Sequence, residues 1–266
     1  MEPAAPAPPQ EPPKRRLSYR VANLQGVGNR QRQEDSFTFV NAMDVTEIRR
    51  KGLLAVVADG MGGMRDGRLA SETAIASLKA DFQAMDRSRD LGPQLRDGIL
   101  SASGKVFAAL GGDGGSTVVT CVFYEEELYF ASVGDSFGFL FREGQLLQLN
   151  REHNVRTEDY LEILRSGSVD PERAREDPEG PALTGFLGME NLREVDEFLK
   201  PMRLHDGDLI LLCSDGVAGV LSEDILKSCL GKRTPEEMCI ALEEAVKSEN
   251  RRYQDNYTAL IIQCGL

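Results

Sequence analysis

The sequence predicts an α+β fold in which a β-sandwich is flanked by helices. Short apolar runs closed by turn residues, such as 53–60 and 209–216, are typical of strands. The segments around 69–85 and 94–110 have apolar residues at helical spacing. A helix with one apolar stripe has to cover another apolar surface, and strand hairpins need a cover as well. A sandwich with helices on its outer faces meets both demands.

The chain has two compositional parts. Residues 1–16 form a Pro/Ala-rich tail that ends in three basic residues. Such a segment has little to bury, so we expect it to be disordered or polyproline-like, with a partner-binding motif as the alternative. From residue 17 to residue 266 the composition is globular, without a second linker or a repeat. With 266 residues and 41% hydrophobic residues, the chain can build one substantial core.

The first half of the globular part alternates strand and helix signals. The continuous apolar run LLAVVADG at 53–60, closed by Asp-Gly, indicates a strand buried on both faces. A helix is predicted around 69–85 because small and large apolar residues recur there four apart, namely Ala70, Ala74, Leu78 and Phe82. A second helix is predicted around 94–110 from a 4-3-4-3 spacing of Leu95, Ile99, Ala102, Val106 and Ala109.

The second half is dominated by strand signals. Residues 116–136 read as two strands around a Glu-rich turn, and 137–149 read as a hairpin that turns at Gly144. LILLCSDG at 209–216 repeats the pattern of an apolar strand that ends in Asp-Gly, and 257–265 forms a last strand.

One further helix is announced by Thr234-Pro235-Glu236-Glu237. Thr234 is a suitable N-cap, Pro235 fits the first helical position, and Glu237 completes a capping box. We therefore expect a helix that begins at Pro235.

The net charge of the chain and the short length of its apolar runs argue against several classes of partner. Lys and Arg number 31 against 43 Asp and Glu, which gives a net charge of −12. Nucleic acids and anionic membranes are bound by clustered basic residues, so we expect neither as a partner. No apolar run approaches the ~20 residues needed to span a bilayer, and the Pro/Ala-rich start does not resemble a signal peptide.

The cysteines and histidines limit the chemistry further. Five cysteines form no C-x-x-C pair, and most stand among apolar neighbours, which indicates reduced core thiols in a cytoplasmic protein. The only histidines, His153 and His205, lie far apart in the sequence. A histidine-based zinc site or a Ser-His-Asp triad is therefore poorly supplied.

Acidic residues stand at strand ends or turns in several separate segments: Glu34-Asp35, Asp59-Gly60, Asp215-Gly216, Asp255-Asn256 and, as a further candidate, Asp135. Any one Asp-Gly is more often only a turn. Here, however, the acids adjoin very apolar strands that can bring them together. Hard divalent cations such as Mg²⁺ or Mn²⁺ select carboxylates and backbone carbonyls as ligands. The pattern therefore suggests a metal site.

Arg30 belongs to the same stretch as the first acids, in GNRQRQED at 28–35. A guanidinium beside metal-held carboxylates is suited to a bidentate grip on phosphate. The alternative is a surface salt bridge with Glu34 or Asp35.

These blocks, in this order, resemble the protein phosphatase type 2C family, the metal-dependent PPM class, over about 17–266, with features of its bacterial members. The matching blocks are GNRQRQED, VVADGMGG, GGST, SVGDS, LTGFLG, DLILLCSDGV and DNYTALII. The resemblance implies a four-layer α-β-β-α sandwich of two antiparallel sheets with a binuclear Mn²⁺ or Mg²⁺ centre at one end.

The resemblance also assigns roles to the candidate residues. Asp59 would bridge the two metals and Gly60 would add its carbonyl. Asp215 and Asp255 would bind one metal and Glu34 would approach the other. Asp35 would act through water or by orienting the cluster, and Arg30 would bind the substrate phosphate. Asp135 resembles the aspartate at which bacterial members bind a third metal.

The implied activity is hydrolysis of phosphoserine and phosphothreonine in proteins by a metal-activated water, without a phosphoenzyme. The implied partners are phosphoproteins that a Ser/Thr kinase has modified, and we expect a monomer. The alternatives are a catalytically weak sensing or binding module and a phosphatase of one regulator or of a small phosphoester.

Some positions depart from the family pattern. Met61 follows the metal-binding Asp-Gly where many eukaryotic members have His, Phe137 follows GDS where Arg is usual, and Gly185-Phe186 replaces a common Arg-Ala. His153 matches a family position, for which we expect a structural role. The charged stretch 155–182 lies where the family carries a flap beside the active site, so it is a candidate for substrate selection, the alternative being a solvated excursion.

Overall fold

The computed structural model describes residues 16–61, 66–167 and 170–266. The predicted N-terminal tail, apart from Arg16, and the two glycines that end VVADGMGG lie outside these residues. Within the described ranges, no helix combines the length and the apolar character needed to cross a membrane.

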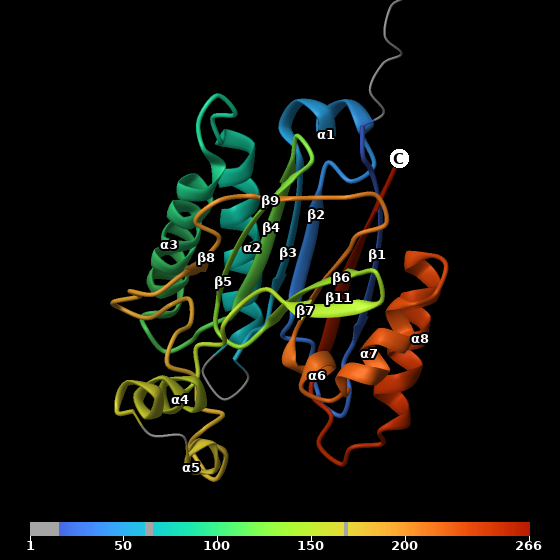
Figure 1. The fold of residues 1–266 in the computed structure, drawn as a ribbon. Coiled ribbons are helices and arrows are strands. Elements are labelled where there is room, and N and C mark those ends of the chain that lie inside the picture. Colours follow the sequence, from blue (N-terminus) through green and yellow to red (C-terminus); the bar gives the residue numbers. More distant parts are fainter. Residues whose placement is uncertain (1–15, 62–65, 168–169) are drawn as a thin grey trace, which may run out of the picture.

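Two antiparallel sheets form the centre of the molecule (Figure 1). One sheet has the strand order β1-β11-β10-β6-β7, with β1 at Ser18–Gly26, β11 at Tyr257–Gly265, β10 at Leu209–Cys213, β6 at Phe137–Arg142 and β7 at Gln145–Gln148. The other has the order β2-β3-β4-β5-β8, with β2 at Ser36–Val40, β3 at Leu53–Ala58, β4 at Val118–Tyr124, β5 at Glu127–Val133 and β8 at Asp196–Glu197. A short strand β9, Met202–Arg203, pairs with β5.

Helices cover both outer faces of this sandwich, as Figure 1 shows. The helices α2 (Gly67–Ala84) and α3 (Leu91–Leu110) pack on the sheet that contains β3, and α6 (Asp215–Ala218), α7 (Glu223–Leu230) and α8 (Pro235–Ser248) pack on the sheet that contains β11. Helix α1 (Val45–Lys51) connects β2 to β3, and α4 (Val155–Arg165) and α5 (Pro171–Arg175) lie at the end of the sandwich where α6 lies. The predicted α+β class and its α-β-β-α layering are confirmed.

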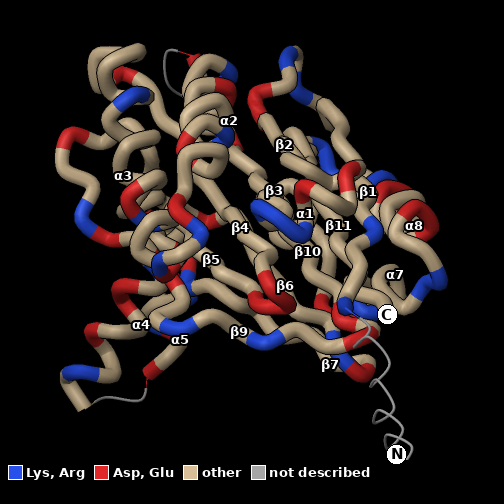
Figure 2. The backbone as a smooth tube through the Cα atoms, turned by 90° about the horizontal axis from the view of Figure 1, so that it is seen from above, with Lys and Arg blue, Asp and Glu red and all other residues tan. Residues whose placement is uncertain are grey.

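The core has three layers because strand residues alternate between two faces. In β3, Leu53, Ala55 and Val57 pack between the sheets. Leu54, Val56 and Ala58 of the same strand pack against α2 and α3. Every residue of β3 is buried, which explains the continuous apolar run in the sequence. The central strands β3, β4 and β10 have no charged residue, and Figure 2 shows the charges mainly on helices and loops.

The predicted hairpins form with two-residue turns. Glu125 and Glu126, between β4 and β5, have φ of 51° and 67°. Glu143 and Gly144, between β6 and β7, have φ of 51° and 76°. Positive φ at both central residues matches the right-handed twist of the paired strands. The Glu-rich turn and the Gly144 turn are therefore confirmed.

The helix predictions are confirmed with corrections. The spacing that placed Ala109 on the buried face of α3 is wrong at that position, because Ala109 is exposed and Leu110 is buried instead. In α8 the Thr234 side chain caps the Glu237 N–H at 3.2 Å, but the Glu237 carboxylate accepts from the N–H of Arg233 rather than of Thr234. The charged 155–182 stretch contains α4 and α5.

All five cysteines are free and buried, as the sequence predicted. Burial raises the pKa of the Cys121 thiol well above its ordinary value, so this thiol is an apolar core group.

Candidate metal centre

The predicted acids gather at one end of the sandwich because of strand order and register. Ser36 pairs with Ala58, so Asp35 before β2 and Asp59 after β3 lie at the same edge. Cys213 pairs with Ala259 in the other sheet, so the residues after β10 and before β11 also lie together. This is the end at which α6 begins, at the bottom of Figure 1.

Asp59 lies at the centre of the cluster. Burial raises the pKa of its carboxyl group well above the ordinary value, and the charges of Asp35, Asp215, Asp135 and Asp255 raise it further. After burial, the charges of Asp35 and Asp215 contribute most to this rise. Strand order and these mutual charge effects place the four aspartates around Asp59 at the same end of the sandwich.

The backbone of Asp59 is held by the chain that enters β4. The Asp59 N–H donates to Oγ1 of Thr117 at 3.1 Å. The Asp59 carbonyl accepts from the Thr117 N–H at 2.8 Å and from the Ser116 hydroxyl at 2.9 Å. These bonds fix the point at which the Asp59 side chain leaves the sheet.

Asp35 is 4% exposed and is bound on one oxygen only. Its Oδ2 accepts from the hydroxyls of Ser214 at 3.0 Å and Thr258 at 2.7 Å. Its Oδ1 is buried without a partner among the described residues. Burial raises the pKa of the Asp35 carboxyl group to about 6.

Asp215 and Asp135 approach from the two sheets. Asp215 is the first residue of α6; burial and then the charge of Asp255 raise the pKa of its carboxyl group. Its Oδ1 is a second buried carboxylate oxygen without a partner in the described structure. Burial and then the charge of Asp215 raise the pKa of Asp135 to about 7.

Glu34 and Gly60 meet through their backbones. A Cβ on Gly60 would lie 2.1 Å from the Gly67 carbonyl oxygen and 2.6 Å from that of Glu34, so only glycine fits there. The Glu34 carbonyl accepts from the Ser71 hydroxyl at 2.5 Å. Both predicted residues therefore lie at the same edge of the cluster.

Asn256 organises the site, a role that sequence reasoning missed. Its Oδ1 accepts from the Glu34 N–H at 2.8 Å, and its Nδ2 donates to the carbonyls of Val27 at 2.9 Å and Arg32 at 3.0 Å. Asn256 is 4% exposed and thus ties the Arg30 segment to the start of β11. The sequence contained a sign of this role, because the Asn256 amide stands directly between an acid and an apolar strand.

Arg30 is half-exposed beside the cluster. Its Nη2 donates to Oδ2 of Asp255 at 2.5 Å. The alternative of a salt bridge with Glu34 or Asp35 is wrong about the partner, because the ion pair forms with Asp255.

The donor set fits hard divalent cations in its chemistry. All candidate donors are oxygens, and two buried carboxylate oxygens lack a partner among residues 16–61, 66–167 and 170–266. The acids also raise one another's pKa. In the described part of the chain, no group of three or more Asp, Glu, His or Cys side chains is arranged to hold a metal ion. Binding an ion therefore requires the carboxylates to turn toward it.

The departures from the family pattern lie in packed surroundings. A Cβ on Gly115 would lie 2.4 Å from the Phe186 ring and 2.9 Å from the Met61 sulfur, so both side chains cover this glycine. Phe137 stacks on Phe139 with ring centroids 5.8 Å apart. These residues therefore serve local packing.

His153 has the backbone contacts of a structural residue. Its ring Nδ1 accepts from the Gly134 N–H at 3.0 Å. The backbone N–H of His153 donates to the Gly134 carbonyl at 2.9 Å. Gly134 has φ of 101° and directly precedes Asp135, so His153 holds the turn that carries this acid.

Comparison with known proteins gives consistent matches. Residues 19–165 match the family described as Protein phosphatase 2C. The serine/threonine phosphatase stp of Listeria welshimeri is 32% identical over 225 residues, which cover 80% of this chain and 85% of that protein.

Two solved structures are similar over most of the chain. The PPM Ser-Thr phosphatase MsPP from Mycobacterium smegmatis, in complex with cacodylate, has a TM-score of 0.73 and 25% identity over 92% of this chain and 97% of its own. The catalytic domain of the phosphatase PstP, in complex with two manganese ions, has a TM-score of 0.74 and 24% identity over 94% of this chain and 100% of its own.

Proposed function

Because the chain belongs to the protein phosphatase 2C family and is a Ser/Thr protein phosphatase, we propose that its acid cluster is the metal centre at which phosphoserine and phosphothreonine are hydrolysed. The observation that carries this proposal is the meeting of Asp35, Asp59, Asp215 and Asp255 at one end of the sandwich. The phosphatase domain would span 17–266.

Each residue would have its own role in metal binding, according to its position in the cluster. Asp59 is central and would bridge two Mn²⁺ or Mg²⁺ ions, with the Gly60 carbonyl beside it. Asp215 and Asp255 would hold one ion, and Glu34 would approach the other. Asp35, already bound by two hydroxyls, would orient the cluster, and Asp135 would serve a third ion.

Two such ions, when bound, supply an activated water near neutral pH and offset the negative charge of the phosphoryl oxygens. Arg30 would bind the substrate phosphate through its planar fork. Its pairing with Asp255 holds the guanidinium next to the acids before substrate arrives. Met61 has no titratable group, so it cannot protonate the leaving oxygen.

The substrates would be phosphoproteins that a Ser/Thr kinase has modified, and the enzyme would act as a monomer in the cytoplasm. Five free, buried cysteines support a reducing compartment.

The test is phosphate release from a phosphothreonine peptide and from p-nitrophenyl phosphate. We expect turnover with Mn²⁺ and none with EDTA, and a phosphotyrosine peptide of the same sequence serves as the control for substrate class. Absence of turnover with Mn²⁺ and Mg²⁺, or activity that survives thorough chelation, would refute the proposal.

A further inference from the structure

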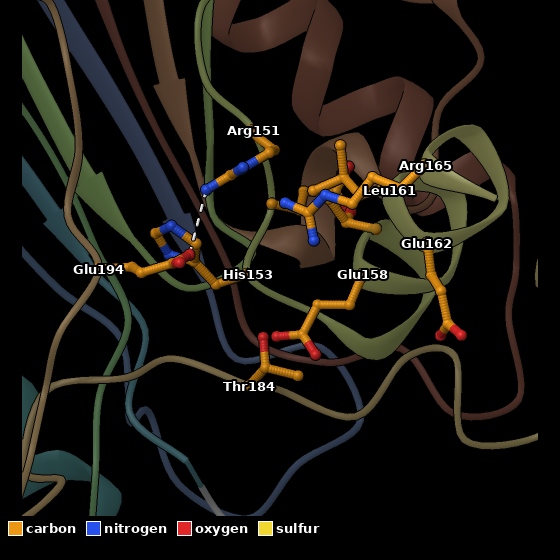
Figure 3. A pocket seen from close by; sticks show the side chains of 10 residues that line it. Arg151, His153, Glu158, Leu161, Glu162, Arg165, Thr184 and Glu194 are labelled. Atoms are coloured by element: carbon orange, nitrogen blue, oxygen red, sulfur yellow. Dashed lines mark hydrogen bonds and ion pairs between the residues drawn. The ribbon is translucent and has the colours of Figure 1, made fainter. Parts of the chain in front are cut away.

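A cleft of about 360 Å³ opens between α4 and the segment before it (Figure 3). It is lined by Arg151, Glu152, His153, Thr157, Glu158, Leu161, Glu162, Arg165, Thr184 and Glu194. His153, which lines the cleft, accepts through Nδ1 from the N–H of Gly134 at 3.0 Å, and Gly134 directly precedes Asp135. The cleft therefore borders the acid cluster. Its volume suits an organic group, since a single water occupies only about 30 Å³.

The charge of the cleft is negative. Four glutamates line it against two arginines. Arg151 and Glu194 form an ion pair at 3.2 Å, drawn as the dashed line in Figure 3. The Glu152 carboxylate accepts from the Asn154 amide at 2.9 Å. The remaining charges, apart from that of Arg165, are the carboxylates of Glu158 and Glu162.

Helix α4 presents these two acids on one face. Glu158, Leu161, Glu162 and Arg165 follow helical i, i+3, i+4 and i+7 spacing. Glu158 and Glu162 are exposed, and in the described residues neither forms an ion pair. Leu161, half-buried between them, offers an apolar surface against which the stem of a long basic side chain can lie.

His153 adds a need for a hydrogen-bond acceptor to the negative charge of the two glutamates. It is 4% exposed, and its Nδ1 accepts the Gly134 N–H, so in the neutral ring the proton is on Nε2. This Nε2 is buried without a partner in the described structure. A buried donor is costly when it is left unpaired. A ligand that completes the cleft therefore brings a hydrogen-bond acceptor as well as a positive charge.

We propose that this cleft binds an Arg or Lys side chain of the substrate protein, close in sequence to its phosphorylated residue. The cation lies at Glu158 and Glu162, its stem lies on Leu161, and a peptide carbonyl accepts from Nε2 of His153. This inference rests on the proposed function and adds a substrate class to it, namely phosphoproteins with a basic residue near the phosphorylation site.

The experiment uses matched phosphothreonine peptides in which one Arg is walked through the positions around the phosphothreonine in an Ala background. Wild type, Glu158→Gln/Glu162→Gln and Glu158→Lys/Glu162→Lys are compared by kcat/KM. The all-Ala peptide is the internal reference for each variant. Glu244→Gln, an exposed change on α8 at the other side of the sandwich, is the matched control.

For one Arg position we expect wild type and the control to prefer the Arg peptide about five- to tenfold, the size of a charge-assisted contact at a partly exposed site. The Gln pair should lose this preference, and the Lys pair should prefer a peptide with Glu at that position. Equal rates on all peptides in wild type, or a preference that survives the Lys pair, would overturn the inference.

A second measurement separates this inference from the proposed function. Fluorescence anisotropy with the Arg peptide in its unphosphorylated form reports binding without turnover. Weaker binding of this peptide by the Lys pair than by wild type supports the cleft even if no peptide is hydrolysed, a result that would refute only the proposed function. Uniform turnover of all peptides, with equal anisotropy in both proteins, refutes only the cleft.

Discussion

Arg30 and Asp255, 225 positions apart in the sequence, form an ion pair at 2.5 Å at the rim of the acid cluster. The proposed phosphate-binding group and a proposed metal ligand are therefore direct neighbours. An ion held by Asp255 would compete with Arg30 for the carboxylate, and the guanidinium would then be available to phosphate.

Replacing Arg30 with Ala should weaken substrate binding more than metal binding. The lost hydrogen bonds to a charged group correspond to about 1.5–3 kcal/mol, which should appear as a raised KM for a phosphopeptide. Mn²⁺ affinity should stay the same or increase slightly, since Asp255 loses a competing partner. Steady-state kinetics combined with Mn²⁺ titration measures both quantities.

Two variants control this experiment. Arg30→Lys keeps the charge without the planar fork, so it should recover only part of the loss. Arg32→Ala removes an exposed arginine of the same segment and should change KM little. A purely structural ion pair predicts instead lower thermal stability of Arg30→Ala with a normal KM and a normal turnover.

Asp59→Asn should lower turnover by more than tenfold, because it removes the central charge of the proposed metal centre. This loss corresponds to more than about 1.4 kcal/mol in the activation free energy. The fold should persist. In EDTA the melting temperature should equal or exceed that of wild type, because the substitution removes a charge that repels Asp35 and Asp215. Retention of more than a tenth of the wild-type rate would exclude Asp59 as the bridging ligand.

Gly60→Ala should disturb the site through its backbone. The new Cβ would meet the Gly67 and Glu34 carbonyl oxygens, so the segment that carries Asp59 has to move. We expect loss of both stability and turnover. Gly104→Ala, in α3 with nothing within 4 Å of the new Cβ, is the matched control and should stabilise by about 0.5–1 kcal/mol. Chemical denaturation and steady-state kinetics on both variants measure stability and turnover. Equal stability and equal turnover of the two variants would mean that Gly60 has room for a Cβ.

Without metal, the cluster should make the folded state less stable as pH rises. Burial raises the pKa of Asp35 to about 6 and that of Asp135 to about 7, whereas an unfolded Asp titrates near ~3.9. Between about pH 4 and 7 the folded chain thus binds protons that the unfolded chain has released, and the free energy of unfolding falls across this window.

Urea denaturation in EDTA at several pH values measures this effect. The difference between wild type and Asp59→Asn isolates the cluster from other titrating groups. Wild type should lose more stability than the variant between about pH 4 and 7. Parallel curves would mean that the acids do not interact as their positions indicate.

The sequence was informative wherever one local pattern decided the structure. The apolar run of β3 predicted a strand buried on both faces, and the Thr234 cap predicted the start of α8. The aspartates of the cluster were also predictable, because each stands next to a strand end. The family resemblance supplied what local patterns lack, the arrangement of strands that brings these ends together.

Other features depend on contacts between distant segments and were not predictable. The pairing of Arg30 with Asp255 rather than with its neighbours Glu34 and Asp35 depends on how the first loop docks on the start of β11. The bridging role of Asn256 depends on the same docking. Ala109 satisfied the spacing rule, but α3 turns Leu110 to the core in its place.

The acid cluster should bind a pair of divalent cations, and calorimetric titration with Mn²⁺ measures this binding without relying on turnover. Wild-type protein freed of metal should bind about two ions per chain, and a weaker third ion at Asp135 is compatible with this result. In Asp59→Asn the tight binding should be lost while the circular dichroism spectrum stays that of the folded protein. Wild-type protein that binds no Mn²⁺, or a folded Asp59→Asn variant that binds it as tightly as wild type, would show that the acid cluster is not a metal centre.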